Sequence, residues 1–274
     1  MSKQSKIIIL LIVVIAVGWG IGKYTSPFAS EGKGSNINVG DNLQGKPGDT
    51  GASEGGGITD PAVVNPSGTP EPANPGPVSS EPDSITVIVN KQYGLPDNYK
   101  PTDLVYPNVR FTFKEKIEKR MMRREAAKAL EKMFAGAEKD GIYLAGVSAY
   151  RSQATQTALY NRYVEKDGEE KARTYSAVPG YSEHQTGLAI DVSASDGKCA
   201  AESCFGGTKE AEWLAEHVGE YGFIIRYPEG KEDITGYKYE PWHIRYVGKE
   251  IATYINEKGI TLEEYYDAIP VSKE

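Results

Sequence analysis

Two separated segments of the chain carry the residue types that bind and activate a catalytic metal ion. One segment contributes His184 and Asp191, and a later one contributes Glu240 and His243, in a chain that has only three histidines. A catalytic Zn²⁺ ion takes three protein ligands from His, Asp, Glu or Cys and leaves a fourth position for water. We therefore predict that His184, Asp191 and His243 bind one Zn²⁺ ion and that Glu240 remains as a base.

Each of these fragments also has an ordinary structural interpretation. A single histidine on a strand is usually a structural residue with satisfied hydrogen bonds, and Glu-x-x-His often occurs by chance. An aspartate at a strand end is more often a cap or a salt-bridge partner. The joint occurrence of all these fragments in one chain favours the metal site.

The residues around the first two candidate ligands alternate as in a strand. Residues Leu188–Val192 place apolar side chains at every second position, so Asp191 points away from the apolar face. Thr186 and Gly187 form a predicted bend. We expect this bend to let His184 fold back toward Asp191.

A second strand carries the other two candidate residues. Residues 242–247 alternate with the same period, and His243 stands on the face opposite Trp242. Pro241 cannot donate a ladder hydrogen bond, so it marks the start of this strand. Glu240 then lies just before this strand. It is close in the sequence to the predicted ligand His243 but is not itself predicted to bind the metal ion.

An arginine upstream is suited to bind a carboxylate. The run Ile142–Tyr150 predicts a strand that ends at Arg151, and Ser152 caps a predicted helix with Gln156 in its first turns. Arg151 and Gln156 are therefore expected to share a cleft, where the planar guanidinium group matches a free terminal carboxylate. A structural ion pair is the alternative for Arg151.

These segments resemble the M15 zinc carboxypeptidases, specifically the branch of VanY-like D-alanyl-D-alanine carboxypeptidases. That family carries Ser-x-His-x-x-Gly-x-Ala-x-Asp followed by Glu-x-x-His. The matching residues here are Ser182, His184, Gly187, Ala189, Asp191, Glu240 and His243. The family's Ser-x-Tyr-Arg-Ser segment is matched by residues 148–152, and the likeness covers about residues 85–255.

The resemblance implies a role for each matched side chain. It implies that the two histidines and the aspartate bind zinc, that Glu240 is the catalytic base and that Arg151 holds the substrate. In the L,D-carboxypeptidase members, positions matching Gln156 and Ser182 also contact the peptide. The implied architecture is that of the Hedgehog/D,D-peptidase fold, with helices packed on a small mixed or antiparallel sheet.

The implied activity is removal of the C-terminal D-alanine from peptidoglycan stem peptides by a zinc D-alanyl-D-alanine carboxypeptidase. An L,D-carboxypeptidase that acts on tetrapeptide stems is one alternative. A non-catalytic wall-binding module with a structural zinc ion is another. The intact Glu240 disfavours the module, because a structural zinc site needs no base.

The N-terminus has the composition of a membrane segment. Two early lysines precede an apolar run over residues 7–22, and Lys23 and Tyr24 follow it. The run is shorter than the roughly 20 residues of a typical spanning helix, and a cleaved signal peptide is the alternative. Because no clear cleavage site follows, we predict an uncleaved anchor, with residues 1–6 in the cytoplasm and the rest outside the bacterial cell membrane.

Residues 23–84 are predicted to be a disordered linker. Positions 30–84 hold 11 glycines and 8 prolines and no aromatic residue. Such a composition cannot bury enough apolar surface to offset its conformational entropy. As a flexible tether it would place the catalytic domain about 40 Å from the membrane.

Residues 85–274 are long enough for one compact catalytic domain, which we predict to be a monomer of the α+β class. The net charge of −7 and the absence of a basic stripe argue against nucleic-acid binding. Two strands are predicted, at Ile85–Val89 and at Phe223–Tyr227. A helix is predicted at about 114–139, with an apolar stripe that begins at Met122, and another from the Thr208 cap to Tyr221. A last helix is predicted to begin at the capping box Thr261-x-x-Glu264.

The remaining candidates for chemistry have structural interpretations. Cys199 and Cys204 are the only cysteines, and outside the membrane they are predicted to form a disulfide across a short loop. Metal binding by this pair is the weaker hypothesis, because no complementary ligand pair is near. His217 lies in a predicted helix beside Trp213, and we interpret it as structural.

Overall fold

The computed structural model of the protein describes Ser79 and residues 81–268. The predicted anchor at residues 7–22 and most of the predicted linker lie outside these residues. Among the residues described, no helix combines the length and the apolar character that a membrane span requires. The predicted boundary at residue 85 falls within the described part, where Asp83 already accepts a hydrogen bond from Tyr99 Oη at 2.8 Å.

Short strands and helices alternate along this part of the chain. The strands are β1 (Leu104–Val105), β2 (Met122–Arg123), β3 (Leu144–Ser148), β4 (Ala189–Ala194), β5 (Phe223–Ile225) and β6 (His243–Tyr246). The α-helices are α1 (Arg124–Lys139), α2 (Gln153–Asp167), α3 (Glu169–Ala172), α4 (Lys209–His217), α5 (Glu232–Thr235), α6 (Lys249–Lys258) and α7 (Leu262–Tyr265). The described residues therefore form a domain that mixes helices and strands, in line with the predicted α+β class.

The main sheet has four antiparallel strands in the order β3-β4-β6-β5, and β1 and β2 form a separate antiparallel pair. The register pairs Ile190 with Ile244 and Asp191 with His243. Because side chains alternate across a sheet, the two isoleucines share one face and the two polar residues share the other. The sheet thus separates an apolar core from a face that carries candidate ligands.

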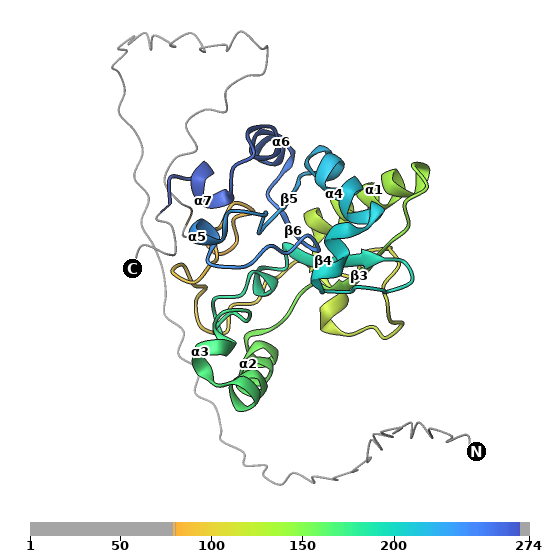
Figure 1. Ribbon diagram of the computed structural model, residues 1–274. Helices are drawn as coiled ribbons and strands as arrows, with labels where there is room; N and C mark the ends of the chain where they lie inside the picture. Colours follow the sequence, from red (N-terminus) through yellow and green to blue (C-terminus); the bar gives the residue numbers. More distant parts are fainter. Residues whose placement is uncertain (1–78, 80, 269–274) are drawn as a thin grey trace, which may run out of the picture. The chain divides into compact units, whose positions relative to one another are not determined.

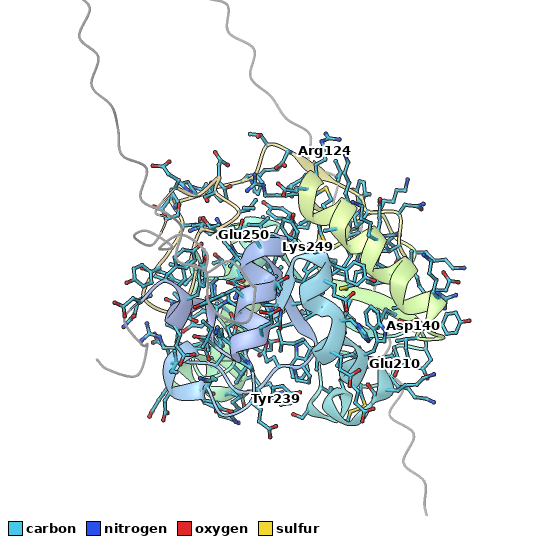
Figure 2. The ribbon with its side chains drawn as sticks, turned by 90° about the horizontal axis from the view of Figure 1, so that it is seen from above. Arg124, Asp140, Glu210, Tyr239, Lys249 and Glu250 are labelled. Atoms are coloured by element: carbon cyan, nitrogen blue, oxygen red, sulfur yellow. A yellow bond between two sulfur atoms is a disulfide. The ribbon has the colours of Figure 1, made fainter. Side chains whose placement is uncertain are left out.

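The helices bury the apolar face. Leu130 and Met133 of α1, Leu214 of α4 and the sheet residues Ile190 and Ile244 belong to one buried cluster. Trp213 of α4 donates a hydrogen bond at 2.9 Å to Asp140 just past the end of α1, so these two helices lie side by side (Figure 2). Helices α2 and α3 lie together, apart from α1 and α4 (Figure 1).

A second apolar cluster lies under the C-terminal helices. Ile224 of β5 packs there with Ala252 and Ile255 of α6 and with Leu262 and Tyr265 of α7. Helix α7 begins with the predicted capping box, in which the side chains of Thr261 and Glu264 each accept a hydrogen bond from the other's backbone N–H. The C-terminal helices therefore complete the domain by covering β5.

The predicted helix at 114–139 begins ten residues too early. Helix α1 starts at Arg124, whereas residues 118–120 form a 3₁₀ turn and residues 122–123 form β2. Met122 is buried, but as part of β2 rather than as the first residue of a helical stripe. Pairing of β2 with β1, together with the bond from Arg123 N to Gly187 O at 2.8 Å, replaces the helical hydrogen bonds.

The predicted strand at Ile85–Val89 is also wrong. Val87 forms a single parallel bridge with Ser79, and no strand extends over the run. The backbone carbonyls of Ile85 and Val87 instead accept hydrogen bonds from the buried Arg245 guanidinium group, at 3.1 and 2.7 Å. A side chain thus takes the acceptors that a neighbouring strand would have used.

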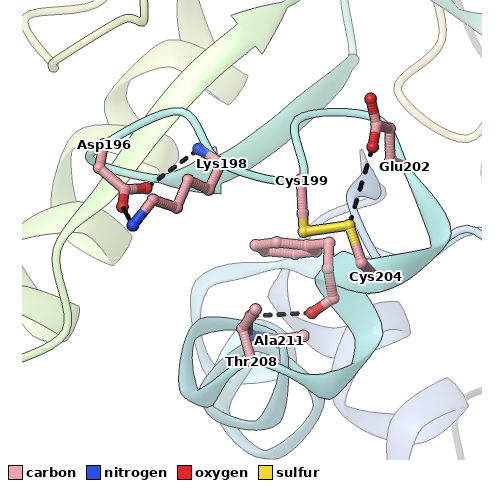
Figure 3. Close-up of a disulfide and its surroundings, with 8 residues drawn as sticks. Asp196, Lys198, Cys199, Glu202, Cys204, Thr208 and Ala211 are labelled. Carbon is pink, nitrogen blue, oxygen red and sulfur yellow. Dashed lines mark hydrogen bonds and ion pairs between the residues drawn. A yellow bond between two sulfur atoms is a disulfide. The ribbon is translucent and has the colours of Figure 1, made fainter. Parts of the chain in front are cut away.

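The two cysteines form the predicted disulfide. Cys199 and Cys204 are bonded, with their Cα atoms 5.5 Å apart (Figure 3). The loop lies just before α4, whose N-terminus is capped by the Thr208 hydroxyl group accepting from Ala211 N. On the other side, Asp196 pairs with Lys198 at 3.2 Å. The disulfide therefore closes a short loop between β4 and α4.

We expect removal of this disulfide to lower the free energy of unfolding modestly. A cross-link across so short a loop is worth about 2 kcal/mol in the chain-entropy model. The double variant Cys199→Ser, Cys204→Ser should therefore unfold at a lower urea concentration than the wild type. Addition of a reductant should shift only the wild type. Identical unfolding midpoints for the two proteins would show that the loop is held by its other contacts.

Candidate metal centre and cleft

The three predicted ligands meet on the polar face of the sheet. His184 Nε2 lies 3.4 Å from Asp191 Oδ2, and His243 Nδ1 lies 3.0 Å from Asp191 Oδ1. One ligand atom from each residue lies within 4.8 Å of the other two, and all three residues are buried. Two imidazoles and one carboxylate thus converge on one point, as a catalytic Zn²⁺ site requires.

The far nitrogen of each imidazole is occupied, which leaves the near nitrogen for a metal ion. His184 Nδ1 donates to the Ala149 carbonyl oxygen at 2.7 Å. His243 Nε2 lies 3.4 Å from a Glu183 carboxylate oxygen. Metal-binding histidines nearly always donate their other N–H to a carbonyl or a carboxylate. The donor set and its supporting contacts therefore fit zinc.

A tight turn brings His184 back over the strand that carries Asp191. Residues Glu183–Thr186 form a 3₁₀ turn that ends at Gly187 with φ +68°. A Cβ atom at Gly187 would also lie 2.8 Å from the Leu104 side chain. Only glycine meets both requirements at low cost, so the predicted bend is confirmed with a physical reason.

The pKa values of the two histidines are shifted in opposite directions. Burial lowers the pKa of His184 to about 3, although the Asp191 carboxylate opposes that shift. Burial also acts to lower the pKa of His243, but hydrogen bonds to Asp191 and Glu183 raise it to about 9. A metal ion at His243 Nδ1 must displace a proton. His184 is already neutral and ready to bind.

Glu240 lies beside the ligands without belonging to the group. Its Oε2 atom is 3.9 Å from His243 Nδ1, and its side chain remains 20% exposed. Burial raises the pKa of Glu240 to about 7, although His243 opposes the shift. The Glu240 backbone N–H bonds to Tyr227 O at 3.0 Å, and His243 N bonds back to Glu240 O at 3.1 Å. These two bonds fix the Glu240 backbone just before β6.

Arg151 lies next to the candidate ligands and is held by hydrogen bonds. Its backbone N–H donates to His184 O at 3.1 Å. Its guanidinium group donates to Gln156 Oε1 at 2.9 Å and to Ser148 Oγ at 3.3 Å. Gln156 is in turn fixed by donating to Ala177 O at 2.6 Å. Gln156 is buried and contacts the arginine, but only Arg151 lines the cleft, so the prediction that the two residues share a cleft is met for Arg151 alone.

A cleft of about 400 Å³ opens onto the candidate ligands. Arg151, Ser182 and Glu240 line it together with the three candidate ligands. The cleft also has aromatic walls, and the lining tyrosines and tryptophan are Tyr163, Tyr175, Tyr227, Tyr237, Tyr239 and Trp242. Ala201 and Ser203 of the disulfide loop also line it. A small peptide end with a free carboxylate matches this arrangement of charges.

Glu183 has a role that the sequence patterns did not predict. This carboxylate is fully buried and pairs with Arg226 and Arg245, each at 2.7 Å. Burial raises the pKa of Glu183, but the two guanidinium groups outweigh burial and hold that pKa well below its usual range. The signal was the occurrence of arginines within the otherwise apolar strand segments around β5 and β6, because buried arginines require anionic partners.

His217 has the structural position that the sequence predicted. It packs against Trp213 with ring centroids 4.9 Å apart and lies 2.8 Å from Glu220. It is not among the residues that line the cleft.

Comparison with known proteins agrees with this site. Residues 119–249 match the family model of VanY, the D-alanyl-D-alanine carboxypeptidases. The putative carboxypeptidase YodJ of Bacillus subtilis is 51% identical over 188 residues, which cover 69% of each chain. The chain belongs to the VanY family. This VanY-family chain is therefore a carboxypeptidase, and hence a hydrolase.

Solved structures of VanY-family relatives have the same fold. The LdcB LD-carboxypeptidase is 51% identical, with a TM-score of 0.66 over 69% of this chain and 88% of that one. A mutant of the vancomycin resistance D,D-pentapeptidase VanY, solved in complex with Zn(II), is 34% identical. Its TM-score is 0.54 over 66% of this chain and 98% of that one. The solved structures that this chain resembles thus include both D,D- and L,D-carboxypeptidases.

Proposed function

We propose that this chain is a zinc-dependent carboxypeptidase that removes the C-terminal D-alanine from peptidoglycan stem peptides. The observation that carries the proposal is the convergence in one cleft of a zinc-type ligand set, a carboxylate beside it and an arginine. The ligand set is His184, Asp191 and His243, the carboxylate is Glu240 and the arginine is Arg151. The zinc-bound structure of a family member supports the choice of metal.

Glu240 acts as general base and then as general acid. When bound, a zinc ion supplies Lewis-acid activation of water and polarisation of the scissile carbonyl group. The Glu240 carboxylate accepts the proton of the attacking water and returns it to the leaving amine of D-alanine. Its position at the cleft wall, close to the ligands and still partly exposed, suits both transfers.

Arg151 selects a chain end. Its guanidinium group holds the free carboxylate of the terminal residue in a two-pronged contact. An internal peptide bond has no such carboxylate, so this contact makes the enzyme an exopeptidase. Gln156 fixes the guanidinium group from behind, and Ser182 lines the cleft next to the ligands. By resemblance to the L,D-carboxypeptidases, Ser182 also contacts the peptide, whereas the buried Gln156 acts through Arg151.

The configuration of the residue before the scissile bond defines two candidate activities. The family model favours a D,D-carboxypeptidase, which removes the last residue of a pentapeptide stem. An L,D-carboxypeptidase acting on tetrapeptide stems is the second candidate. This L,D-activity is favoured by the higher sequence identity to LdcB, which is 51%, against 34% for the D,D-pentapeptidase.

Release of free D-alanine from synthetic stems tests the proposal and separates the two activities. The full chain is incubated with a pentapeptide ending in D-Ala-D-Ala and with a tetrapeptide ending in an L-amino acid followed by D-Ala. The proposal predicts release from at least one of them. Faster release from the pentapeptide identifies the D,D-activity, and faster release from the tetrapeptide identifies the L,D-activity. No release from either would overturn the proposal.

Metal analysis tests the ligand set independently of turnover. We expect the wild type to bind about one zinc ion per chain, because the three ligands define a single site. The double variant His184→Ala, His243→Ala should bind none at this site. Its fold is checked by circular dichroism. Full zinc occupancy in a folded double variant would show that zinc binds elsewhere.

We also propose that the enzyme works outside the cell, held at the membrane by residues 7–22. The early lysines and the absence of a clear cleavage site support this location. Full-length protein should then sediment with the membrane fraction. A soluble mature protein whose N-terminus lies between residues 23 and 35 would show that the run is a cleaved signal peptide.

A further inference from the structure

We propose that Glu183 is a positioning residue that orients His243 for metal binding, and that a buried four-charge cluster holds Glu183 in place. The inference rests on the proposed function, because it concerns the same metal centre. The cluster consists of Glu183 in the 3₁₀ turn before β4, Arg226 directly after β5, Arg245 in β6 and Glu263 in α7. The side chains of all four residues are 0% exposed.

The two oxygens of Glu183 have separate partners. Oε1 accepts from Arg226 Nε and from Arg245 Nη1, both at 2.7 Å. Oε2 lies 3.4 Å from His243 Nε2. The arginine bonds therefore determine how the carboxylate is turned, and that orientation points the second oxygen at the imidazole.

The arginines are themselves fixed by partners that lie away from the metal ligands. Arg226 makes a two-pronged contact with Glu263 at 2.6 and 2.9 Å. Asn90 donates to the same carboxylate at 3.0 Å. Arg245 donates to the backbone carbonyls of Ile85 and Val87. The orientation of one imidazole thus depends on contacts with α7 and with the segment before β1.

An imidazole can bind a metal ion through Nδ1 only when the proton is on Nε2. The Glu183 oxygen is an acceptor placed at Nε2, so it favours that tautomer. At the same time it limits rotation of the ring, which Tyr227 covers with its own ring at a centroid distance of 4.9 Å. Glu183 therefore presents Nδ1 to the point shared with His184 and Asp191.

Glu183→Gln reverses the contact with little change in shape. The amide oxygen should take the position of Oε1, because both arginines are donors. The amide NH₂ group then faces His243 Nε2, so two donors oppose each other. We expect zinc affinity, measured by competition with a chromophoric chelator, to fall by about 10- to 100-fold, the usual effect of losing such a partner.

Glu263→Gln is the matched control. It removes the other negative charge of the cluster, yet Glu263 does not contact His243 among the interactions described. Both variants should lose stability in urea, because each leaves a buried arginine with weakened pairing. Only Glu183→Gln should lose zinc affinity by tenfold or more. This split separates positioning of the ligand from support of the fold.

A second variant keeps the test decisive if Glu183→Gln does not fold. The double variant Glu183→Gln, Arg245→Gln restores the charge balance of the cluster, and removing both members of a buried pair is far less costly than removing one. It should fold and still bind zinc at least tenfold more weakly than the wild type. Wild-type affinity in either folded Glu183 variant, or an equal loss in Glu263→Gln, would overturn the inference. A wild type that binds no zinc would instead refute the proposed function.

Discussion

Glu240→Gln should bind zinc and keep its fold but lose about 10²- to 10⁴-fold in turnover, the usual contribution of a general base. The substitution changes one oxygen for an NH₂ group, so the shape of the cleft is preserved. Glu240 is not one of the three convergent ligands, and its backbone is fixed by bonds to Tyr227 and His243. Turnover is measured as release of D-alanine from a stem peptide, and zinc is measured on the same preparation.

Glu257→Gln provides the control for this result. Glu257 is exposed on α6, and its substitution by glutamine removes the same charge from the protein. It should leave turnover unchanged. If Glu240→Gln also turned over at a near-normal rate with zinc bound, Glu240 would not be the base. The non-catalytic module with a structural zinc ion would then gain support only if the wild type were inactive as well.

Arg151→Ala should reduce kcat/KM by about 30- to 5,000-fold, which corresponds to the 2–5 kcal/mol lost when one partner of a desolvated charge pair is removed. Arg151→Lys keeps the positive charge but loses the planar two-pronged contact, so it should also be impaired. The measurement is D-alanine release at several substrate concentrations. Lys166→Ala, on the last turn of α2 and outside the cleft, is the control.

The substrate can be changed instead of the enzyme. A stem peptide whose terminal carboxylate is amidated lacks the group that Arg151 is proposed to hold. The wild type should cleave this amide far more slowly than the free acid, and Arg151→Ala should discriminate between the two much less. Equal cleavage of acid and amide by the wild type would mean that Arg151 is structural and that the enzyme is not limited to chain ends.

The convergence of the three candidate ligands could be predicted from sequence, because each of them lies in a short pattern that determines its local backbone structure. Asp191 and His243 alternate with apolar residues, so their strands had to turn them to the same face once the strands paired. Gly187 marked the bend that returns His184 to that face. The caps at Ser152, Thr208 and Thr261 were equally local, because a cap depends on residues three positions apart.

The parts that could not be predicted depend on contacts between distant segments. Residues 114–123 have helical composition, yet residues 118–120 form a 3₁₀ turn and Met122 and Arg123 pair with β1. The run Ile85–Val89 has strand composition, yet Arg245 takes its carbonyl groups. Glu183 adjoins a predicted ligand, but its role follows only from Arg226 and Arg245, which are more than 40 residues away in the sequence.

The most direct test of the metal-dependent carboxypeptidase is mass spectrometry of muropeptides digested by the full chain. Three digests are compared: with zinc, with a chelator, and with the His184→Ala, His243→Ala variant in zinc. The account predicts loss of one C-terminal alanine from stem peptides in the first digest and intact stems in the other two. Equal alanine loss in the presence of chelator, or products cut within the stem, would contradict a zinc carboxypeptidase built on His184, Asp191 and His243.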